Sequence, residues 1–457
     1  MIDSVAYFFY NVFSWIFEIF HWLFTTPWLS WLWPLAGTIL LGYIAYKLWM
    51  HYIRQNFISG ITWSLLEIIP PREVLRSPKA MELFLNNALY HFSYKGGLET
   101  YWQGAVWFWF SLEIASIDGQ VHFYIRTPSR IKDLIETQMY AQYPQAYIKE
   151  VEDYTLGVDE ISPKSEWNGW GCEFKLEKPE VFPLKTYTDF GLDKDPKEEY
   201  KVDPISSVVE LFGSIQKGEQ MWMQIVITPS KKKYHTHGTW FKHHDWVEEG
   251  QIQIKKILKP FTGERERAIT APGTVSLEIR APGFMDELVK GSARKLLKLG
   301  FDTGIRIFYA AKKEIFPFGT RTNNSRNIRL IFRQYANPFS NQLTRFNNTQ
   351  ADAYQSNFLS GFFIISPKTI MILANRMLHE YRERAFFHLP LRHHLFSKHT
   401  LFWPFSHLFH AYFHHETFVL NVEELATMFH FPGQILKVPT LERIESKEAT
   451  PPPNLPT

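Results

Sequence analysis

The sequence predicts an α+β protein anchored in a membrane. We expect an N-terminal transmembrane helix, alone or as a hairpin with a preceding amphipathic helix, then two tandem ferredoxin-like (βαββαβ) modules and a helical C-terminal segment. Two observations predict this fold class: an early apolar run without charged residues, and a periodic alternation of strand and helix patterns after it. The expected boundaries are 1–57 for the anchor, 58–155 and 156–346 for the modules, 229–270 for an insertion in the second module, 347–447 for the helical region and 448–457 for a disordered tail.

The anchor is predicted from the run between Pro27 and Tyr46, which has no charged side chain. A helix over Trp28–Tyr46 is roughly 28 Å long, close to the thickness of a hydrocarbon core. Lys47 and Arg54 follow the run, so the positive-inside rule places the bulk of the chain in the cytoplasm at the inner membrane. Aromatic residues typical of a membrane interface flank the run, and we expect these to hold the anchor: Trp28, Trp31, Trp33, Tyr46 and Trp49.

The preceding stretch, Val5–Phe24, is apolar but has a stripe of four polar residues on one helical face, among them Glu18. An ionised carboxylate facing lipid costs about 2.5–3.5 kcal/mol at the bilayer centre, which disfavours a lipid-facing span. Three interpretations stay open: a helix in the interface, a span whose stripe faces a partner helix, or a tilted anchor in which the stripe has no role.

The first module is predicted over Ile61–Tyr154. Strand patterns occur at Ile61–Ile69, Val106–Ile117, Gln120–Arg126 and Ala146–Tyr154, and helices begin at Ser77-Pro78 and at Ser129. Asp118-Gly119, between two strand patterns, indicates a tight hairpin. The order is β-α-β-β-α-β, as in a ferredoxin-like unit.

The second module repeats this order less clearly. Strand patterns occur at Gly171–Glu177, Gln220–Thr228 and Gly304–Lys312, and helices are expected at Asp203–Ile215, Trp246–Leu258 and Phe284–Leu299. Thr274–Ala281 fits a strand or a loop.

Charge is unevenly distributed, although the net charge is only +3. Residues 150–200 contain 14 acidic and 6 basic side chains, whereas residues 290–346 contain 12 basic and 2 acidic ones. The basic stretch fits a nucleic-acid or acidic-partner surface, a solvated face that balances the acidic region, or contact with anionic headgroups. The candidate nucleic-acid-binding residues are Lys295, Lys298, Arg306, Lys312, Lys313, Arg326, Arg329 and Arg333.

The sequence lacks the common catalytic motifs. GxxxxGK(S/T), HExxH and GxSxG are absent, and the lone cysteine, Cys172, excludes a disulfide framework and a cysteine-based zinc site. Histidines cluster in two places that suit a metal or an amphipathic surface, namely His235, His237, His243, His244 with Asp245, and His407, His410 and His414. We expect no enzyme activity, no cofactor and no bound metal.

The C-terminal region holds two further features. Met377–His415 is rich in histidine, arginine and aromatic residues and suits a membrane-adjacent segment or a buried helix pair. Asn421 is the expected N-cap of a short helix with acidic residues in its first turn. The tail after Glu448 is proline-rich and is expected to be disordered.

Three stretches together resemble a known family: FYIRTPSRIKDLIETQMYAQYP (Phe123–Pro144), KLGFDTGIRIFYAAKKE (Lys298–Glu314) and FVLNVEELATMFHFPG (Phe418–Gly433). They are similar to the membrane-anchored N-terminal half of bacterial conjugative-transfer, type IV secretion-like ATPases of the HerA/FtsK superfamily. In such proteins the last stretch leads into the motor domain. The sequence ends where a P-loop domain would begin, so the resemblance implies a separate ATPase partner.

The resemblance therefore implies a non-enzymatic membrane component, an oligomer within an assembly, that docks a P-loop ATPase of a transfer machine. The residues expected to dock the partner are Asn421, Glu423, Glu424, Leu425, His430, Phe431 and Pro432. The alternative is a membrane-tethered nucleic-acid-binding module that uses residues 290–346 and binds DNA.

Overall fold

The structure is a computed structural model of the whole chain. It describes residues 14, 18, 32–71, 74, 76–90, 96–193, 202–230, 234–235, 243–262, 283–317, 327–349, 367–384, 386–387 and 415–433. These belong to two compact units, unit 1 (Met1–Ile61 and Tyr94–Val106) and unit 2 (Thr62–Ser93 and Trp107–Thr457).

The described part of unit 1 includes a long helix, α3 (Leu32–Ser59), and a short helix, α5 (Gly97–Tyr101). The indole Nε1 of Trp49 donates a hydrogen bond to the carbonyl of Tyr101 over 3.2 Å. Gly104 adopts a φ of +71°, and a Cβ there would lie 2.4 Å from the backbone of Ile53. Only glycine therefore allows the two segments of unit 1 to approach so closely.

The transmembrane helix that the sequence suggested is not supported. Among the described helices, none combines the length and the apolar character that a bilayer crossing requires. The run between Pro27 and Tyr46 has no charged residue, which is why the sequence suggested a span. However, Pro34, Tyr43 and Tyr46 lower its mean hydropathy, and Lys47 follows it directly. Of Val5–Phe24, only Ser14 and Glu18 are described, so the three interpretations of that stretch lie outside the described residues.

Unit 2 is built on one nine-stranded sheet in the order β10-β5-β9-β6-β2-β3-β1-β4, with β11 also paired to β9. Every one of its pairings is antiparallel. The strands are β1 (Trp63–Ile69), β2 (Phe110–Ile117), β3 (Gln120–Pro128), β4 (Tyr147–Val151), β5 (Trp167–Leu176), β6 (Glu219–Pro229), β9 (Gly300–Lys312), β10 (Leu343–Phe346) and β11 (Phe418–Asn421).

The predicted architecture of two tandem ferredoxin-like modules is therefore wrong. Seven of the nine strands lie close to where the sequence pattern puts them, whereas β10 was not predicted. Strand β2 pairs with β6 over Phe110–Ile117, and this ladder joins both halves into one sheet. Strand β11, from the region expected to be helical, adds to the same sheet. Local patterns predict strands, whereas the choice of neighbour depends on contacts between distant segments.

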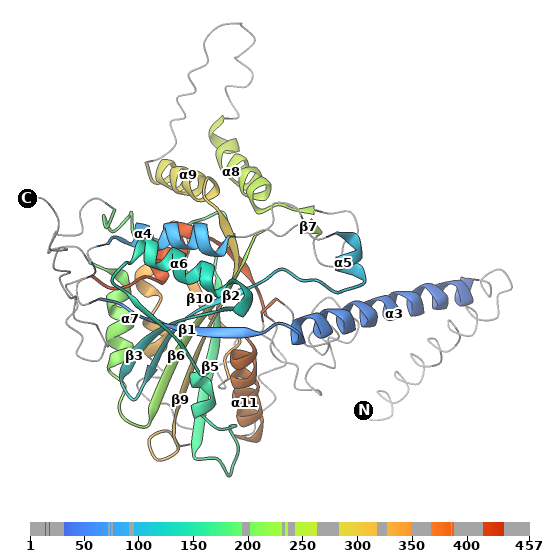
Figure 1. Ribbon diagram of the computed structural model, residues 1–457. Coiled ribbons are helices and arrows are strands. Elements are labelled where there is room, and N and C mark those ends of the chain that lie inside the picture. The colour runs from blue at the N-terminus through green and yellow to red at the C-terminus, as the bar shows by residue number, and fades with distance from the viewer. Residues whose placement is uncertain are drawn as a thin grey trace, which may run out of the picture. The chain divides into compact units, whose positions relative to one another are not determined.

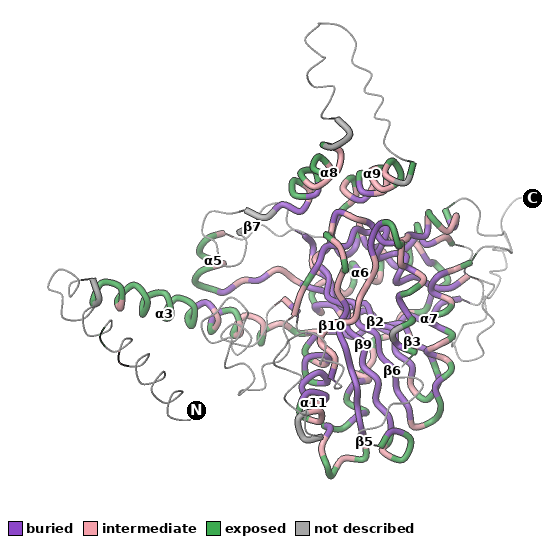
Figure 2. The backbone as a smooth tube through the Cα atoms, turned by 180° about the vertical axis from the view of Figure 1, so that it is seen from behind, coloured by how far each residue is buried: buried purple, intermediate pink, exposed green. Residues whose placement is uncertain are grey.

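Helices cover both faces of the sheet (Figure 1). One face packs against α4 (Pro78–Phe84), its π-helical continuation (Leu85–Leu89), α6 (Lys132–Gln142), α7 (Pro204–Gly213) and α13 (Val422–Met428). The other face packs against α11 (Pro367–Glu383), whose Met377 and Tyr381 belong to a second apolar cluster together with Trp222 and Phe308. The strands are buried along most of their length (Figure 2).

Smaller elements complete unit 2. Between β6 and β9 the chain forms a two-stranded ladder and two helices, and single 3-10 turns connect other segments. These elements are β7 (Tyr234–His235), β8 (His243–His244), α8 (Trp246–Thr262), α9 (Gly283–Leu296), and the turns Ser129–Ile131, Tyr154–Gly157, Ile328–Leu330 and Arg333–Tyr335. Thr274–Ala281, which the sequence left between strand and loop, lies outside the described residues.

The β2–β3 hairpin forms at the Asp118-Gly119 pair, as the sequence predicts. Both residues have positive φ, +52° and +88°, which is the backbone that a type I′ turn requires. The turn also contacts the rest of the sheet, because the amide of Gly218 donates to Asp118 Oδ1 over 2.7 Å. A Cβ at Gly119 would lie 2.8 Å from the carbonyl oxygen of Ile215.

We predict that Gly119→Ala lowers the free energy of unfolding by more than Gly191→Ala does. Both glycines have positive φ, +88° and +72°, so both alanines strain the backbone by about 1–3 kcal/mol. Only the Cβ at Gly119 meets another atom, whereas Gly191 faces open space. Chemical denaturation of the two variants measures the difference, and equal losses would show that the contact with Ile215 has no cost.

Candidate functional site

A row of polar side chains crosses the face of the sheet that α11 covers. One residue from each of seven neighbouring strands contributes, and each member stands opposite the next in the strand register. The pairs are Lys149–Glu67, Glu67–Tyr124, Tyr124–Glu113, Glu113–Gln224, Gln224–Arg306 and Arg306–Glu173. Because residues directly opposite each other share a face, these side chains form one line, which we call the polar row.

The middle of the polar row is buried. Glu113, Gln224 and Arg306 are fully buried, and Glu173 is 1% exposed. An ionised side chain in this position destabilises the fold unless an opposite charge and hydrogen bonds compensate for the lost water. The structure provides these partners from neighbouring strands, from α11 and Arg384 directly after it, and from His415.

The first group of partners surrounds Glu113. Arg384 donates to both carboxylate oxygens of Glu113, through Nε over 2.9 Å and Nη2 over 3.1 Å, and it also contacts Asp153. Tyr154 donates its hydroxyl to Glu113 Oε2 over 2.8 Å. Burial by itself would raise the pKa of Asp153, but the guanidinium of Arg384 holds that pKa below its ordinary value.

Gln224 fixes the end of α11 to the same group. Its Nε2 donates to Glu113 Oε1 over 3.2 Å and to the carbonyl of Tyr381 over 2.9 Å. Arg384 follows α11 with a φ of +52°, so the chain turns there and directs the guanidinium back to the sheet. The C-terminal end of α11 is therefore positioned by hydrogen bonds to the polar row.

The second group surrounds Glu173. Arg306 Nη2 lies 2.6 Å from Glu173 Oε1 and 3.6 Å from Glu380 Oε2. His415 Nδ1 lies 2.7 Å from Glu173 Oε1, and His415 Nε2 lies 3.3 Å from Glu380 Oε2. Arg376 pairs with Glu380 one helical turn away over 3.1 Å.

Glu173, Glu380 and His415 have the donor atoms of a metal site, since one ligand atom from each lies within 4.8 Å of the others. Their charges are already matched, however. The guanidinium of Arg306 stands between the carboxylates. Burial by itself would lower the pKa of His415, but Glu173 and Glu380 raise it to about 9. The imidazole is therefore protonated at neutral pH, and neither ring nitrogen has a free lone pair with which to bind a metal ion. The cluster fits an internal ion-pair network better than a metal centre.

The third group lies toward the β4 edge and is more exposed. Glu67 accepts from His122 Nδ1 at 2.6 Å and pairs with Lys149 Nζ at 3.0 Å. Burial acts to raise the pKa of Glu67, and the hydrogen bonds from His122 and Lys149 bring it below its ordinary value.

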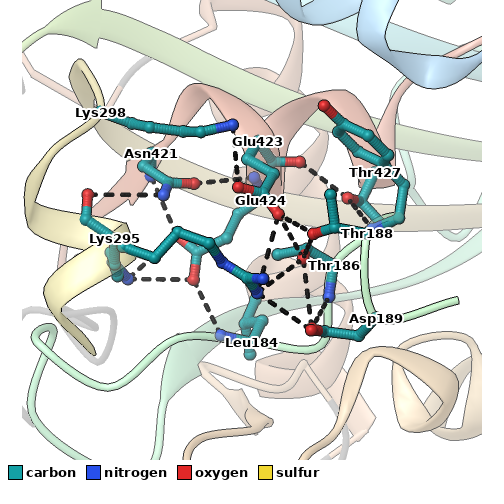
Figure 3. A network of polar contacts seen from close by, with 12 residues as sticks. Leu184, Thr186, Thr188, Asp189, Lys295, Lys298, Asn421, Glu423, Glu424 and Thr427 are labelled. Atoms are coloured by element: carbon teal, nitrogen blue, oxygen red, sulfur yellow. Dashed lines mark hydrogen bonds and ion pairs between the residues drawn. The ribbon is translucent and has the colours of Figure 1, made fainter. Parts of the chain in front are cut away.

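A separate network holds the C-terminal segment to the opposite face, and we call it the clasp network (Figure 3). It begins with a capping box on α13: Asn421 Oδ1 accepts from the amide of Glu424 over 2.8 Å, and Glu424 Oε2 accepts from the amide of Asn421 over 2.9 Å. Glu424 also pairs with Lys295 over 3.0 Å and accepts from the amide of Leu184 over 2.8 Å. The side chains of Lys295 and Glu424 are both fully buried.

Glu423 makes the second half of the clasp network. It accepts from the hydroxyls of Thr186 and Thr188 and pairs with Lys298 Nζ over 2.9 Å. Lys298 in turn pairs with Glu82 of α4 over 2.7 Å. Burial would raise the pKa of Glu423, but these hydrogen bonds from the threonines and Lys298 lower it.

The stretch predicted to dock a partner is thus buried in this chain's own fold. Asn421, Glu423, Glu424, Leu425, His430, Phe431 and Pro432 are all buried. His430 bridges α13 and α7, because its Nδ1 contacts the carbonyl of Ala426 at 2.9 Å and its Nε2 contacts Asp203 at 3.0 Å. A docking role for these residues stays a prediction, but in the described structure their side chains contact their own chain.

Most of the basic residues predicted to bind nucleic acid have partners within the chain. Lys295, Lys298 and Arg306 belong to the networks above, Lys312 lies 3.8 Å from Glu166, and Lys313 donates to the carbonyls of Ser162 and Pro163. Arg333 is exposed. Arg326 and the side chain of Arg329 lie outside the described residues, and nucleic-acid binding stays a prediction.

The remaining predicted residues lie partly outside the described part of the chain. Tyr46 and Trp49 are exposed on α3, whereas Trp28, Trp31 and the side chain of Trp33 are not among the described ones. Asp245, from the first histidine group, caps α8 by accepting from the amide of Val247. His237, His407, His410 and His414 lie outside the described residues.

The residues predicted from the sequence did not include the polar row, although a signal for it exists. Apolar strand segments each contain one buried Glu, Arg or Gln near their middle, as in LLEII, FSLEIASI, GCEFK, GIRIFYAA and MWMQIVI. A single Glu, Arg or Gln inside an otherwise apolar strand indicates a buried polar partner on a neighbouring element. His415, which the histidine clusters passed over, lies directly after His414.

No family model matches the chain, and no curated protein sequence matches it significantly.

We predict that Arg384→Met lowers the free energy of unfolding by about 3–5 kcal/mol, because it leaves the buried carboxylate of Glu113 without its cation. The control, Lys290→Met, removes an exposed pair with Asp286 and should leave stability unchanged. Adding Glu113→Gln to Arg384→Met should recover part of the loss, which a double-mutant cycle measures by chemical denaturation. A loss for Arg384→Met no greater than the control's would contradict this role.

We also predict that the stabilisation from His415 is lost at alkaline pH. The folded-state pKa, about 9, is above the unfolded value of about 6.5, so the protonated imidazole stabilises the fold fully below pH 6.5 and progressively less as pH rises to about 9. Unfolding free energies measured from pH 6 to 9.5 should fall more steeply for the native chain than for His415→Gln. Parallel pH profiles would show that His415 does not titrate in this way.

Proposed function

We propose that this chain is a non-enzymatic assembly component that docks a separate P-loop ATPase of a transfer machine. The proposal rests on the resemblance of Phe418–Gly433 to the stretch that leads into the motor domain of conjugative-transfer ATPases. The observation that carries it is the clasp network. Buried ion pairs fix this stretch between α9, α4 and the loop at Leu184. A partner that binds beside this stretch would therefore contact residues whose positions are already fixed.

The chemistry of the buried groups supports a binding role over a catalytic one. In the polar row, and in the clasp network, the ionisable side chains named above are engaged with opposite charges of the same chain. Catalytic groups need access to a substrate and a pKa suited to proton transfer. Here the burial and pairing serve to hold segments together.

The partner surface that we favour lies beside the clasp network. Lys298 pairs with Glu82, and the sequence neighbours of this pair expose large leucine side chains: Leu83 by 42%, Leu297 by 88% and Leu299 by 38%. Single exposed leucines are ordinary. These three, however, are sequence neighbours of one ion pair, Lys298–Glu82, and together they form a candidate hot spot for a partner. We call these three residues the leucine surface.

We predict that Leu297→Asp abolishes recovery of the ATPase partner. The variant should fold, because this side chain is almost fully exposed. The matched control is Leu156→Asp, which changes a leucine that is 69% exposed and belongs to a separate 3-10 turn. The measurement is affinity capture of the tagged full chain from its native host, followed by identification of captured polypeptides that contain GxxxxGK(S/T).

A P-loop ATPase recovered with the native chain and with Leu156→Asp, but at least tenfold less with Leu297→Asp, supports the proposal. Recovery of no such ATPase contradicts the docking function. Equal recovery with both variants contradicts the leucine surface as the contact.

A further inference from the structure

Helix α3 exposes large apolar side chains on every side. Leu35, Ile39, Leu40, Leu41 and Ile44 are between 43% and 68% exposed. Successive residues of an α-helix are rotated by about 100°, so residues 39, 40 and 41 alone project to three different sides. A helix of this kind is ordinarily buried rather than solvated.

The exposed area is large enough for a stable interface. Ten large apolar residues of α3 are more than 40% exposed: Leu35, Ile39, Leu40, Leu41, Tyr43, Ile44, Tyr46, Leu48, Trp49 and Tyr52. Half-exposed side chains of this size amount to roughly 1,000 Å², if each has about 200 Å² in total. A standard protein interface buries about 800 Å² per partner.

We infer that α3 packs against α3 of other copies of this chain, in a bundle of identical helices. A single partner on one side of α3 would cover some of these residues and leave the opposite side in water, whereas a bundle of several copies covers more than one side of each helix. Self-association through one shared surface is also the commonest way in which soluble proteins form closed oligomers.

The small residues of α3 suit this occupant. A Cβ at Gly37 or Gly42 would meet no atom within 4 Å. Each glycine therefore leaves a shallow gap between the large side chains next to it on the helix surface, and we call such a gap a step. Ala36 and Ala45 extend these steps on the exposed surface. A large side chain of another copy, such as Leu41, fits a step of this kind and lets the two backbones approach.

The test is the mass of the full chain, measured by sedimentation velocity without detergent. The native chain should form a discrete oligomer, and Leu40→Asp should dissociate it or raise its dissociation constant at least tenfold. The control is Leu156→Asp, which places the same charge on an exposed leucine of unit 2 and should leave the mass unchanged.

A second variant, Gly42→Leu, separates specific packing from general adhesion of apolar surface. It enlarges the apolar surface but fills the step at Gly42, so a packed α3–α3 interface should weaken. Adhesion to lipid or to unrelated proteins should strengthen instead.

Three results would overturn the inference. They are a monomeric native chain, an oligomer that persists in Leu40→Asp, and association that Gly42→Leu strengthens. Flotation of the native chain with phosphatidylcholine vesicles, lost in Leu40→Asp, would identify lipid as the occupant and would also overturn it.

Discussion

Buried charges in the centre of a sheet are the constraint on which the architecture of unit 2 depends. Removing an ionised carboxylate from water costs several kcal/mol, and only a well-placed cation with further hydrogen bonds offsets that cost. Glu113 and Glu173 therefore determine what can cover this face of the sheet. Helix α11 places Arg376 and Glu380 on one side, and Arg384, directly after the end of the helix, turns back to reach Glu113. Without Arg384, the buried carboxylate of Glu113 would lose its cation.

On the opposite face of the sheet, the buried charges that need partners belong to the C-terminal segment. Strand β11 extends the sheet beside β9, and α13 then turns back over the apolar core. Its acidic first turn is buried, so Glu423 and Glu424 need cations, which Lys295 and Lys298 supply from around α9. Two of the basic residues that the sequence suggested for nucleic acid thus neutralise the two glutamates that it suggested for a protein partner. Charge counts along a sequence do not distinguish an exposed binding surface from half of an internal ion pair.

The division between the two units has consequences for function. In unit 2 the polar groups described above are used mainly to fix segments to the sheet, and the large apolar side chains are mostly buried. In unit 1 the apolar side chains of α3 are mostly exposed, which is unfavourable in water unless something covers them. In the described residues, unit 2 thus uses its buried charges to hold its own segments together, whereas α3 leaves apolar surface exposed.

The sequence by itself determined the local elements. Asp118-Gly119 predicts its hairpin and Asn421 its helix cap, because each depends on the backbone preferences of adjacent residues. It did not determine that β2 pairs with β6, that Lys295 meets Glu424, or that polar residues of seven strands align. The first two features join residues more than a hundred positions apart, and all three exist only after the strands have paired. Tertiary structure decided them, because the free energy of a buried charge depends on what surrounds it and not on its place in the chain.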